Sequence, residues 1–233
     1  MTSTKDAPGS RPGSWLTRPG SLLDVNAVAR LLRSAMQPLD IDGDGIPDGP
    51  ADTNAADVAA RLLLLHSVLE HGRLWVAERD GRPVAAAIWV PGETGVGPGS
   101  DDLGGILRRE LQVDSVSDVA ALVGPDERVR PFLEDAMAAA FGAVESARLV
   151  LYGVVVDPAV VDDVDVVALA RELVAPVVAE LDDAGESAYA LALDPARASL
   201  LEAAGFRRVD AVPFGVGHTV WVGRAHHRAP LPA

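Results

Sequence analysis

The chain contains no cysteine, which excludes disulfides, thiolate metal sites and cysteine nucleophiles. Lysine is nearly absent as well: Lys5 is the only one in 233 residues, so arginine carries almost all of the positive charge. The formal net charge of −14 argues against nucleic acids and anionic membranes as partners, because both bind to basic surfaces. The same charge opposes any polyanionic cofactor unless its site is locally positive.

Aromatic residues make up only 4% of the chain, so a core has to be built from valine, leucine and alanine. No apolar run reaches the ~20 residues that a membrane span needs. The most apolar stretch, residues 136–156, is interrupted by Glu145 and Arg148. The N-terminus lacks the apolar segment of a secretory signal. We therefore expect a cytoplasmic protein that acts on a small-molecule substrate, and we leave a homodimer open.

The length of the chain suits one domain with a sizeable core. Residues 1–13 are rich in proline, glycine, serine and threonine, and this composition predicts a disordered N-terminal tail. Residues 226–233 similarly predict a flexible C-terminal tail. We expect residues 14–225 to form a single domain without internal repeats.

Hydrophobic periodicity predicts strands and helices in alternation, which is a mixed α/β fold. Residues 147–156 form a fully apolar run, which is typical of a strand at the centre of a sheet covered on both faces. The other expected strands are residues 15–18, a hairpin over 73–90 that turns at 79–83, and residues 187–194, 206–214 and 218–225. The first expected helix begins after a cap at Ser21 or Asp24. Four further helices are expected over residues 55–72, 101–111, 125–144 and 196–205, and another, long helix is expected to end at Gly185.

Several stretches, taken in this order, resemble the GNAT superfamily of acyl-CoA N-acyltransferases. They are TRPGSLLDVNAVARLL with Arg18 and Asp24, LWVAERDGRPVAAAIWVPG, VVVDP, and ALALDPARASLLEAAGF, which ends in Gly205-Phe206. The resemblance covers roughly residues 14–225. It implies a mixed β-sheet that is splayed open at its centre and flanked by helices.

The resemblance also implies a reaction, the transfer of an acyl group such as acetyl from an acyl-CoA to the amine of a small molecule. The cofactor, acetyl-CoA or another acyl-CoA, would pair its pantetheine arm with the fourth strand through the backbone at Val154 and Val156. Its diphosphate would lie at the N-terminus of the next helix. Free N–H groups and the helix dipole make that end of a helix an anion site.

The expected phosphate loop departs from the family pattern, which is Gln or Arg, two residues, Gly, one residue, then Gly or Ala. Counted back from the end of the helix, the loop covers residues 165–170, with Ala168 and Ala170 at the glycine positions and Arg171 next. Counted forward from the strand, it covers residues 161–166. We prefer the first alignment, which makes Ala168, Ala170 and Arg171 the phosphate contacts.

Both alignments lose the glutamine or arginine of the first position and place an aspartate within the loop. A carboxylate there repels a diphosphate, and alanine does not easily adopt the positive φ that glycine allows. Aspartate is also a preferred N-cap residue. We therefore expect Asp162, Asp163 or Asp165 to cap the helix, so that the protein itself supplies the anion at its N-terminus.

A second departure concerns the proton donor. Leu201 stands where many family members carry a tyrosine that is thought to protonate the leaving thiolate, and Asp194 replaces the usual asparagine. Tyr152 is a weak candidate for the missing catalytic acid, because its predicted strand borders the cleft. A packing role in the core is the preferred interpretation of this tyrosine.

Two functions are compatible with these patterns, and the sequence does not separate them. One is the acyltransferase with an atypical CoA loop. The alternative is a GNAT-fold protein that has lost acyl-CoA binding, uses no such cofactor, and binds a small molecule or a partner or catalyses a different reaction. The missing glycines, the aspartates of the expected phosphate loop and Leu201 favour the alternative. The strand pattern favours neither function, because a fold does not determine a function.

The stretch DIDGDGIPD carries carboxylates at alternate positions and resembles the aspartate-rich calcium repeats of extracellular proteins. The candidate ligands are Asp40, Asp42, Asp44 and Asp48. Only one copy is present, and Ala51 occupies the position at which an EF-hand needs a bidentate glutamate. A solvated acidic loop is therefore the preferred interpretation and calcium the alternative.

Overall fold

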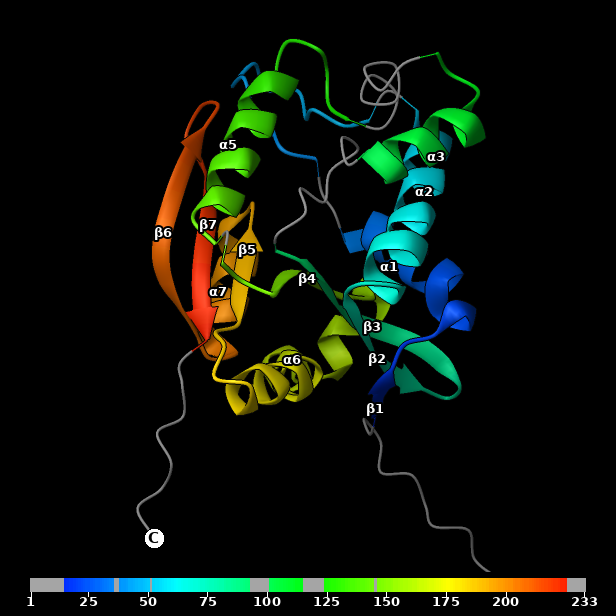
Figure 1. Cartoon of the computed structure of the whole chain (residues 1–233), viewed down its shortest axis with the longest axis vertical. Helices are drawn as coiled ribbons and strands as arrows, with labels where there is room; N and C mark the ends of the chain where they lie inside the picture. Colours follow the sequence, from blue (N-terminus) through cyan, green and yellow to red (C-terminus); the bar gives the residue numbers. More distant parts are fainter. Residues whose placement is uncertain are drawn as a thin grey trace, which may run out of the picture.

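A seven-stranded mixed sheet organises the computed structural model (Figure 1). The structure describes residues 15–35, 38–50, 52–92, 101–114, 124–144 and 146–225, so both predicted tails lie outside the described residues. The strand order is β1-β2-β3-β4-β5-β7-β6, and only the β4–β5 pair is parallel. The strands are β1 (Leu16–Pro19), β2 (Arg73–Arg79), β3 (Arg82–Pro91), β4 (Leu149–Val156), β5 (Tyr189–Ala192), β6 (Phe206–Phe214) and β7 (His218–Ala225).

The helices follow the predicted order with shifted ends. They are η1 (Leu22–Asp24), α1 (Val25–Ala35), α2 (Thr53–Leu62), η2 (Leu63–Leu69), α3 (Asp101–Leu111), α5 (Arg130–Gly142), η3 (Pro158–Asp163), α6 (Val166–Asp183) and α7 (Pro195–Ala203). The helix predicted over 55–72 changes to π-helical geometry at Leu63, and the one predicted from residue 125 begins at Arg130. No helix within the described ranges is long and apolar enough to cross a membrane.

Helices cover both faces of the sheet and create two apolar cores. On one face α1, η2 and α5 pack against the strands through residues such as Val28, Leu64 and Ala140. On the other face α6 and α7 pack through residues such as Leu173 and Leu201. The central strand β4 contributes to both cores, which explains its fully apolar sequence and confirms the prediction made from it.

The sheet opens between β4 and β5. These strands pair at only two positions, Val150 with Tyr189 and Leu151 with Ala190. Beyond them β4 continues to Val156 and stays paired with β3 on its other side, as far as the pair between Val156 and Ala85. Figure 1 shows the resulting two arms, β1 to β4 and β5 to β6. The predicted central splay is therefore confirmed.

A β-bulge lies where the sheet opens. In the β3–β4 register Ile88 is opposite Gly153 and Trp89 is opposite Leu151, so Tyr152 has no counterpart in β3. Leu151 and Val154 consequently both face α6, although strict alternation would place them on opposite faces. A bulge bends its strand and re-aims side chains, so it places Tyr152 at the point where β4 loses β5.

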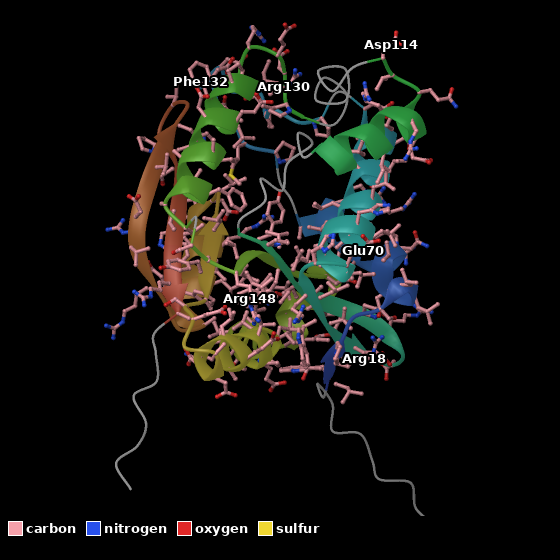
Figure 2. All side chains as sticks on the ribbon, viewed as in Figure 1. Arg18, Glu70, Asp114, Arg130, Phe132 and Arg148 are labelled. Atoms are coloured by element: carbon pink, nitrogen blue, oxygen red, sulfur yellow. The ribbon has the colours of Figure 1, made fainter. Side chains whose placement is uncertain are left out.

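An ion pair between the half-buried Arg18 and the buried Asp24 connects β1 to the start of α1. The guanidinium of Arg18, labelled in Figure 2, donates to both carboxylate oxygens of Asp24 at 2.8 Å and also to Glu78 of β2 at 3.0 Å. The Ser21 backbone N–H and hydroxyl donate to the same carboxylate at 2.8 and 2.9 Å. These hydrogen bonds, that from Arg18 above all, lower the pKa of Asp24 from 3.8 to about 2 despite its burial.

This pair predicts an acid-sensitive contribution to stability. A pKa that is lower in the folded state stabilises the protein above pH ~4, and this contribution is lost as the pH falls toward 2. We expect Asp24→Asn to lower the free energy of unfolding at pH 7 by about 2 kcal/mol, because Arg18 loses its buried partner. Urea denaturation between pH 2 and 7 measures both effects.

The matched control is Glu78→Gln, which removes the other, more exposed carboxylate that pairs with Arg18. We expect a loss below about 1 kcal/mol for that variant. If Asp24→Asn kept the acid dependence of the wild-type protein, Asp24 would not be its source.

Candidate functional site

The open edge of β4 is the first element of the candidate site. Val154 and Val156 lie beyond the last β4–β5 pair, and their side chains pack on the α6 face. Among the described residues, no strand pairs with this side of β4 after Leu151. Buried backbone amides require hydrogen-bond partners. An extended ligand with amide groups can supply them in the way that an added strand does.

Arg197 connects the two faces of the molecule near the opening. Asp194 caps α7 by accepting a hydrogen bond from the Arg197 backbone N–H at 2.8 Å, and it pairs with the Arg197 side chain at 3.0 Å. The guanidinium also donates to the backbone carbonyl of Ala35, at the end of α1, at 2.6 Å. Sequence reasoning missed this arginine. The only available signal was the spacing of Asp194 and Arg197, three residues apart, after a predicted strand.

Tyr152 lies at the edge of the core on the face of α1 and α5, where it is half-buried. Burial raises the pKa of its phenol above 10, and the positive charge of Arg197 partly opposes this shift. No hydrogen bond joins its hydroxyl to any residue that the structure describes. Tyr152 is therefore protonated at neutral pH, and the charge of Arg197 acts on its phenol. Its side chain also packs against the core, as preferred from the sequence.

The N-terminus of α6 carries its own carboxylate. Asp165 is the N-cap, and its Oδ1 accepts a hydrogen bond from the Ala168 N–H at 2.9 Å. The Leu169 N–H then makes the first helical bond, to the Asp165 carbonyl, also at 2.9 Å. The expectation that an aspartate caps this helix is confirmed for Asp165. The extra residues after Pro158, which the preferred alignment required, form η3.

The other groups assigned to phosphate contacts also have partners within the protein. Arg171 donates from Nε and Nη2 to the carbonyl of Ala203, at 2.9 and 2.6 Å. Ala170 is fully buried in the core beneath α6. A second arginine near this loop, Arg79, pairs with Asp163 at 3.6 Å. The open edge of β4 therefore fits a pantetheine arm, whereas the start of α6 does not fit a diphosphate.

Leu201 is buried against the α6 face with 2% of its surface exposed. Its side chain has no proton to donate, and its surroundings are those of an ordinary core leucine. Any protonation of a leaving group in this protein therefore has to come from another residue or from water.

Residues 40–48, called the acidic loop below, bring together three of their four candidate metal ligands. Carboxylate oxygens of Asp40, Asp42 and Asp48 lie within 4.8 Å of one another, while Asp44 is not part of this group. The same carboxylates accept backbone hydrogen bonds, for example from Gly45 to Asp40 at 2.9 Å. Oxygen donors of this kind suit calcium. A melting temperature that falls when calcium is chelated would select calcium over the solvated loop.

The acidic loop is anchored on the turn between β6 and β7. The Val216 N–H donates to the Ile41 carbonyl at 2.8 Å, and the His218 ring bonds the Asp40 carbonyl through Nε2 at 2.7 Å. Gly215 adopts φ +51°, and a Cβ at this position would lie 2.3 Å from the Ile41 carbonyl oxygen. The approach of the two segments therefore requires glycine at residue 215.

A separate cavity of about 340 Å³ lies beside β2 and α6, with Trp75, Pro176 and Glu180 among its lining residues. None of the residues that line it belongs to the open edge of β4, to α7 or to the start of α6. It is therefore not an extension of the candidate site.

No protein-family model and no curated protein matches the sequence. Solved structures do match the fold. A crystal structure of an acetyltransferase aligns with a TM-score of 0.56 at 14% identity, over 91% of this chain and 100% of that chain. The polyamine N-acetyltransferase of Drosophila melanogaster gives 0.55 at 17% identity, over 91% and 100%. An N-acetyltransferase from Staphylococcus aureus gives 0.53 at 11% identity, over 90% and 100%. The chain thus has the GNAT fold.

The anchoring of the acidic loop predicts unequal costs for two glycine substitutions. Gly215→Ala should lower the free energy of unfolding by at least about 2 kcal/mol, because backbone strain adds to the clash with Ile41. Gly217→Ala is the matched control: it has φ +76° but nothing within 4 Å of the added Cβ, so strain alone should cost about 1 kcal/mol. Urea denaturation compares the two. Equal losses would show that the contact with Ile41 is unimportant.

Proposed function

We propose that the chain is an N-acyltransferase that moves an acyl group, such as acetyl, from a pantetheine thioester to the amine of a small molecule. Acyl-CoA is the donor that the fold suggests, and the cytoplasm is the compartment we propose. The observation that carries the proposal is the edge of β4 from Gly153 to Val156, which is paired with β3 but has lost β5. A pantetheine arm is an extended chain with two amides, and it can satisfy such an edge.

The backbone of β4 would hold and orient the donor. Hydrogen bonds to Val154 and Val156 would fix the arm, and a fixed thioester next to a bound amine gains most of its rate from positioning. Backbone N–H groups aimed at the thioester oxygen would stabilise the negative charge that develops there. The amine nitrogen then forms a bond to the carbonyl carbon, the carbon–sulfur bond breaks, and the proton released by the amine passes to water.

The leaving sulfur needs a proton, and Tyr152 is the residue we assign to donate it. Burial keeps its phenol protonated at neutral pH. The neighbouring charge of Arg197, which favours the phenolate, would stabilise the tyrosine after it has given up its proton. Arg197 is in turn held by Asp194 and the Ala35 carbonyl. Water would then return the proton to Tyr152.

Ligand binding and thiol release together test this proposal. Acetyl-CoA at ~100 times its dissociation constant should stabilise the protein by about 2.7 kcal/mol, which a thermal melt detects. Agmatine and polyamines are suitable first acceptors, since one protein of the same fold forms N-acetylagmatine. Thiol release that requires both donor and amine would support the proposal. The absence of any shift with thioesters at millimolar concentration would refute it.

The second candidate function is a GNAT-fold protein without acyl-thioester chemistry. The hydrogen bond from Ala168 to Asp165 and that from Arg171 to Ala203 favour it, because they occupy groups that would otherwise face a diphosphate. This candidate predicts no response to any thioester and a response to some other small molecule or a partner. The same thermal melts therefore separate the two functions.

The role of Tyr152 is testable by Tyr152→Phe. We expect kcat to fall about 10²-fold with little change in KM, because a general acid acts on the transition state. The melting temperature should hardly change, since the hydroxyl has no hydrogen bond to a described residue. Tyr189→Phe is the matched control on β5, where the ring lies under Arg224. A Tyr152→Phe enzyme with full kcat would leave Tyr152 only its packing role.

A further inference from the structure

We propose that this chain recognises its acyl donor through the acyl group and pantetheine arm and not through the diphosphate, and that Asp165 sets this specificity. The inference rests on the proposed acyltransferase function and narrows its donor. It predicts that an acyl-pantetheine, which has no phosphate, is as good a donor as the corresponding acyl-CoA.

The first reason is that one of the free N–H groups at the start of α6, that of Ala168, already has an anionic partner. The Asp165 carboxylate lies at the helix terminus and accepts the hydrogen bond of Ala168 at 2.9 Å. A diphosphate would have to displace this carboxylate or lie beside it. Both arrangements are unfavourable, because the carboxylate complements the helix dipole and repels another anion.

The second reason is the local balance of charge. Between the end of β4 and the start of α6 the chain carries four aspartates, and two arginines near this segment already have partners. Arg79 pairs with Asp163, and Arg171 is fixed on the Ala203 carbonyl by two hydrogen bonds. The four aspartates are Asp157, Asp162, Asp163 and Asp165. The surroundings of the helix terminus are therefore negative, which disfavours a polyphosphate.

The third reason is that the open edge of β4 imposes no such penalty. It offers backbone amides beside the apolar side chains of Val154 and Val156. These groups suit a neutral chain of amides and methylenes, and their contribution to binding does not depend on the group attached to the far end of the pantetheine. Donor affinity should therefore come from the arm and the acyl group.

A series of three donors tests the proposal with the wild-type chain: S-acetyl-pantetheine, S-acetyl-4′-phosphopantetheine and acetyl-CoA. Calorimetry gives their dissociation constants, and thiol release in the presence of an amine gives their KM values. We expect the three dissociation constants to agree within about threefold. Acetyl-CoA that binds tenfold or more tightly than S-acetyl-pantetheine would overturn the inference.

Asp165→Asn tests the residue itself. Asparagine caps a helix as well as aspartate does, so the substitution removes the charge and keeps an oxygen that can accept the Ala168 hydrogen bond. We expect acetyl-CoA to bind about two- to fivefold more tightly to this variant, with S-acetyl-pantetheine unchanged. An unchanged ratio of the two dissociation constants would show that Asp165 does not set the specificity.

The matched control is Asp52→Asn. Asp52 caps α2 by accepting hydrogen bonds from Asn54 and Ala55 at 2.8 and 3.2 Å, so the variant makes the same chemical change at another helix terminus. For this variant we expect no change in the ratio of the dissociation constants of acetyl-CoA and S-acetyl-pantetheine. If the ratio changed equally in both variants, the net charge of the protein, and not the position of Asp165, would account for the effect.

The two proposals fail differently. If none of the three donors binds, the acyltransferase function is refuted and the inference is refuted with it. If acetyl-CoA binds and S-acetyl-pantetheine does not, the function stands and only the inference is refuted. The thermal stability of each variant, measured without ligand, shows whether a change in affinity reflects a loss of folding.

Discussion

The separation of β4 from β5 is the constraint on which the rest of this structure depends. Two strands at the centre of a sheet normally pair along their whole length, because buried amides need partners. Here the pairing stops after Val150 and Leu151, while β3 still holds the other side of β4. The bulge at Tyr152 bends the strand at that point, and Arg197 ties α7 to α1 nearby. A strand that is held on one side and open on the other is a binding edge.

The start of α6 shows how a fold can keep its backbone while its charge pattern changes. A helix N-terminus attracts an anion, and that anion can be a ligand or a side chain. In this chain Asp165 fills the role, and Arg171 is used to join α6 to α7 through Ala203. Asp165 thus complements the helix dipole and satisfies the Ala168 N–H from within the chain. In the donor recognition that we propose, affinity would come from the neutral part of the donor and from the open edge of β4.

Sequence patterns predicted much of the fold because they are local. The apolar run of β4, the hairpin of β2 and β3, and the helix that ends near Gly185 were all predictable from periodicity and turn residues. Helix capping by an aspartate was also predictable, since the competing N–H groups belong to the next few residues. The start of α5 at Arg130 and the π-helical turn at Leu63 were not, because helix ends depend on packing with distant segments.

By itself the sequence determined the composition of the core, the order of the elements, the absence of cysteine chemistry and the acidic character of the loop before α6. Tertiary structure alone decided which groups are available to a ligand. Arg171 could have faced a phosphate, but its partner is a carbonyl 32 residues away, on α7. Arg197 reaches Ala35 across 162 residues, and three aspartates of the acidic loop converge while Asp44 does not. Hydrogen bonds between residues far apart in the chain depend on three-dimensional distance, which a linear pattern does not contain.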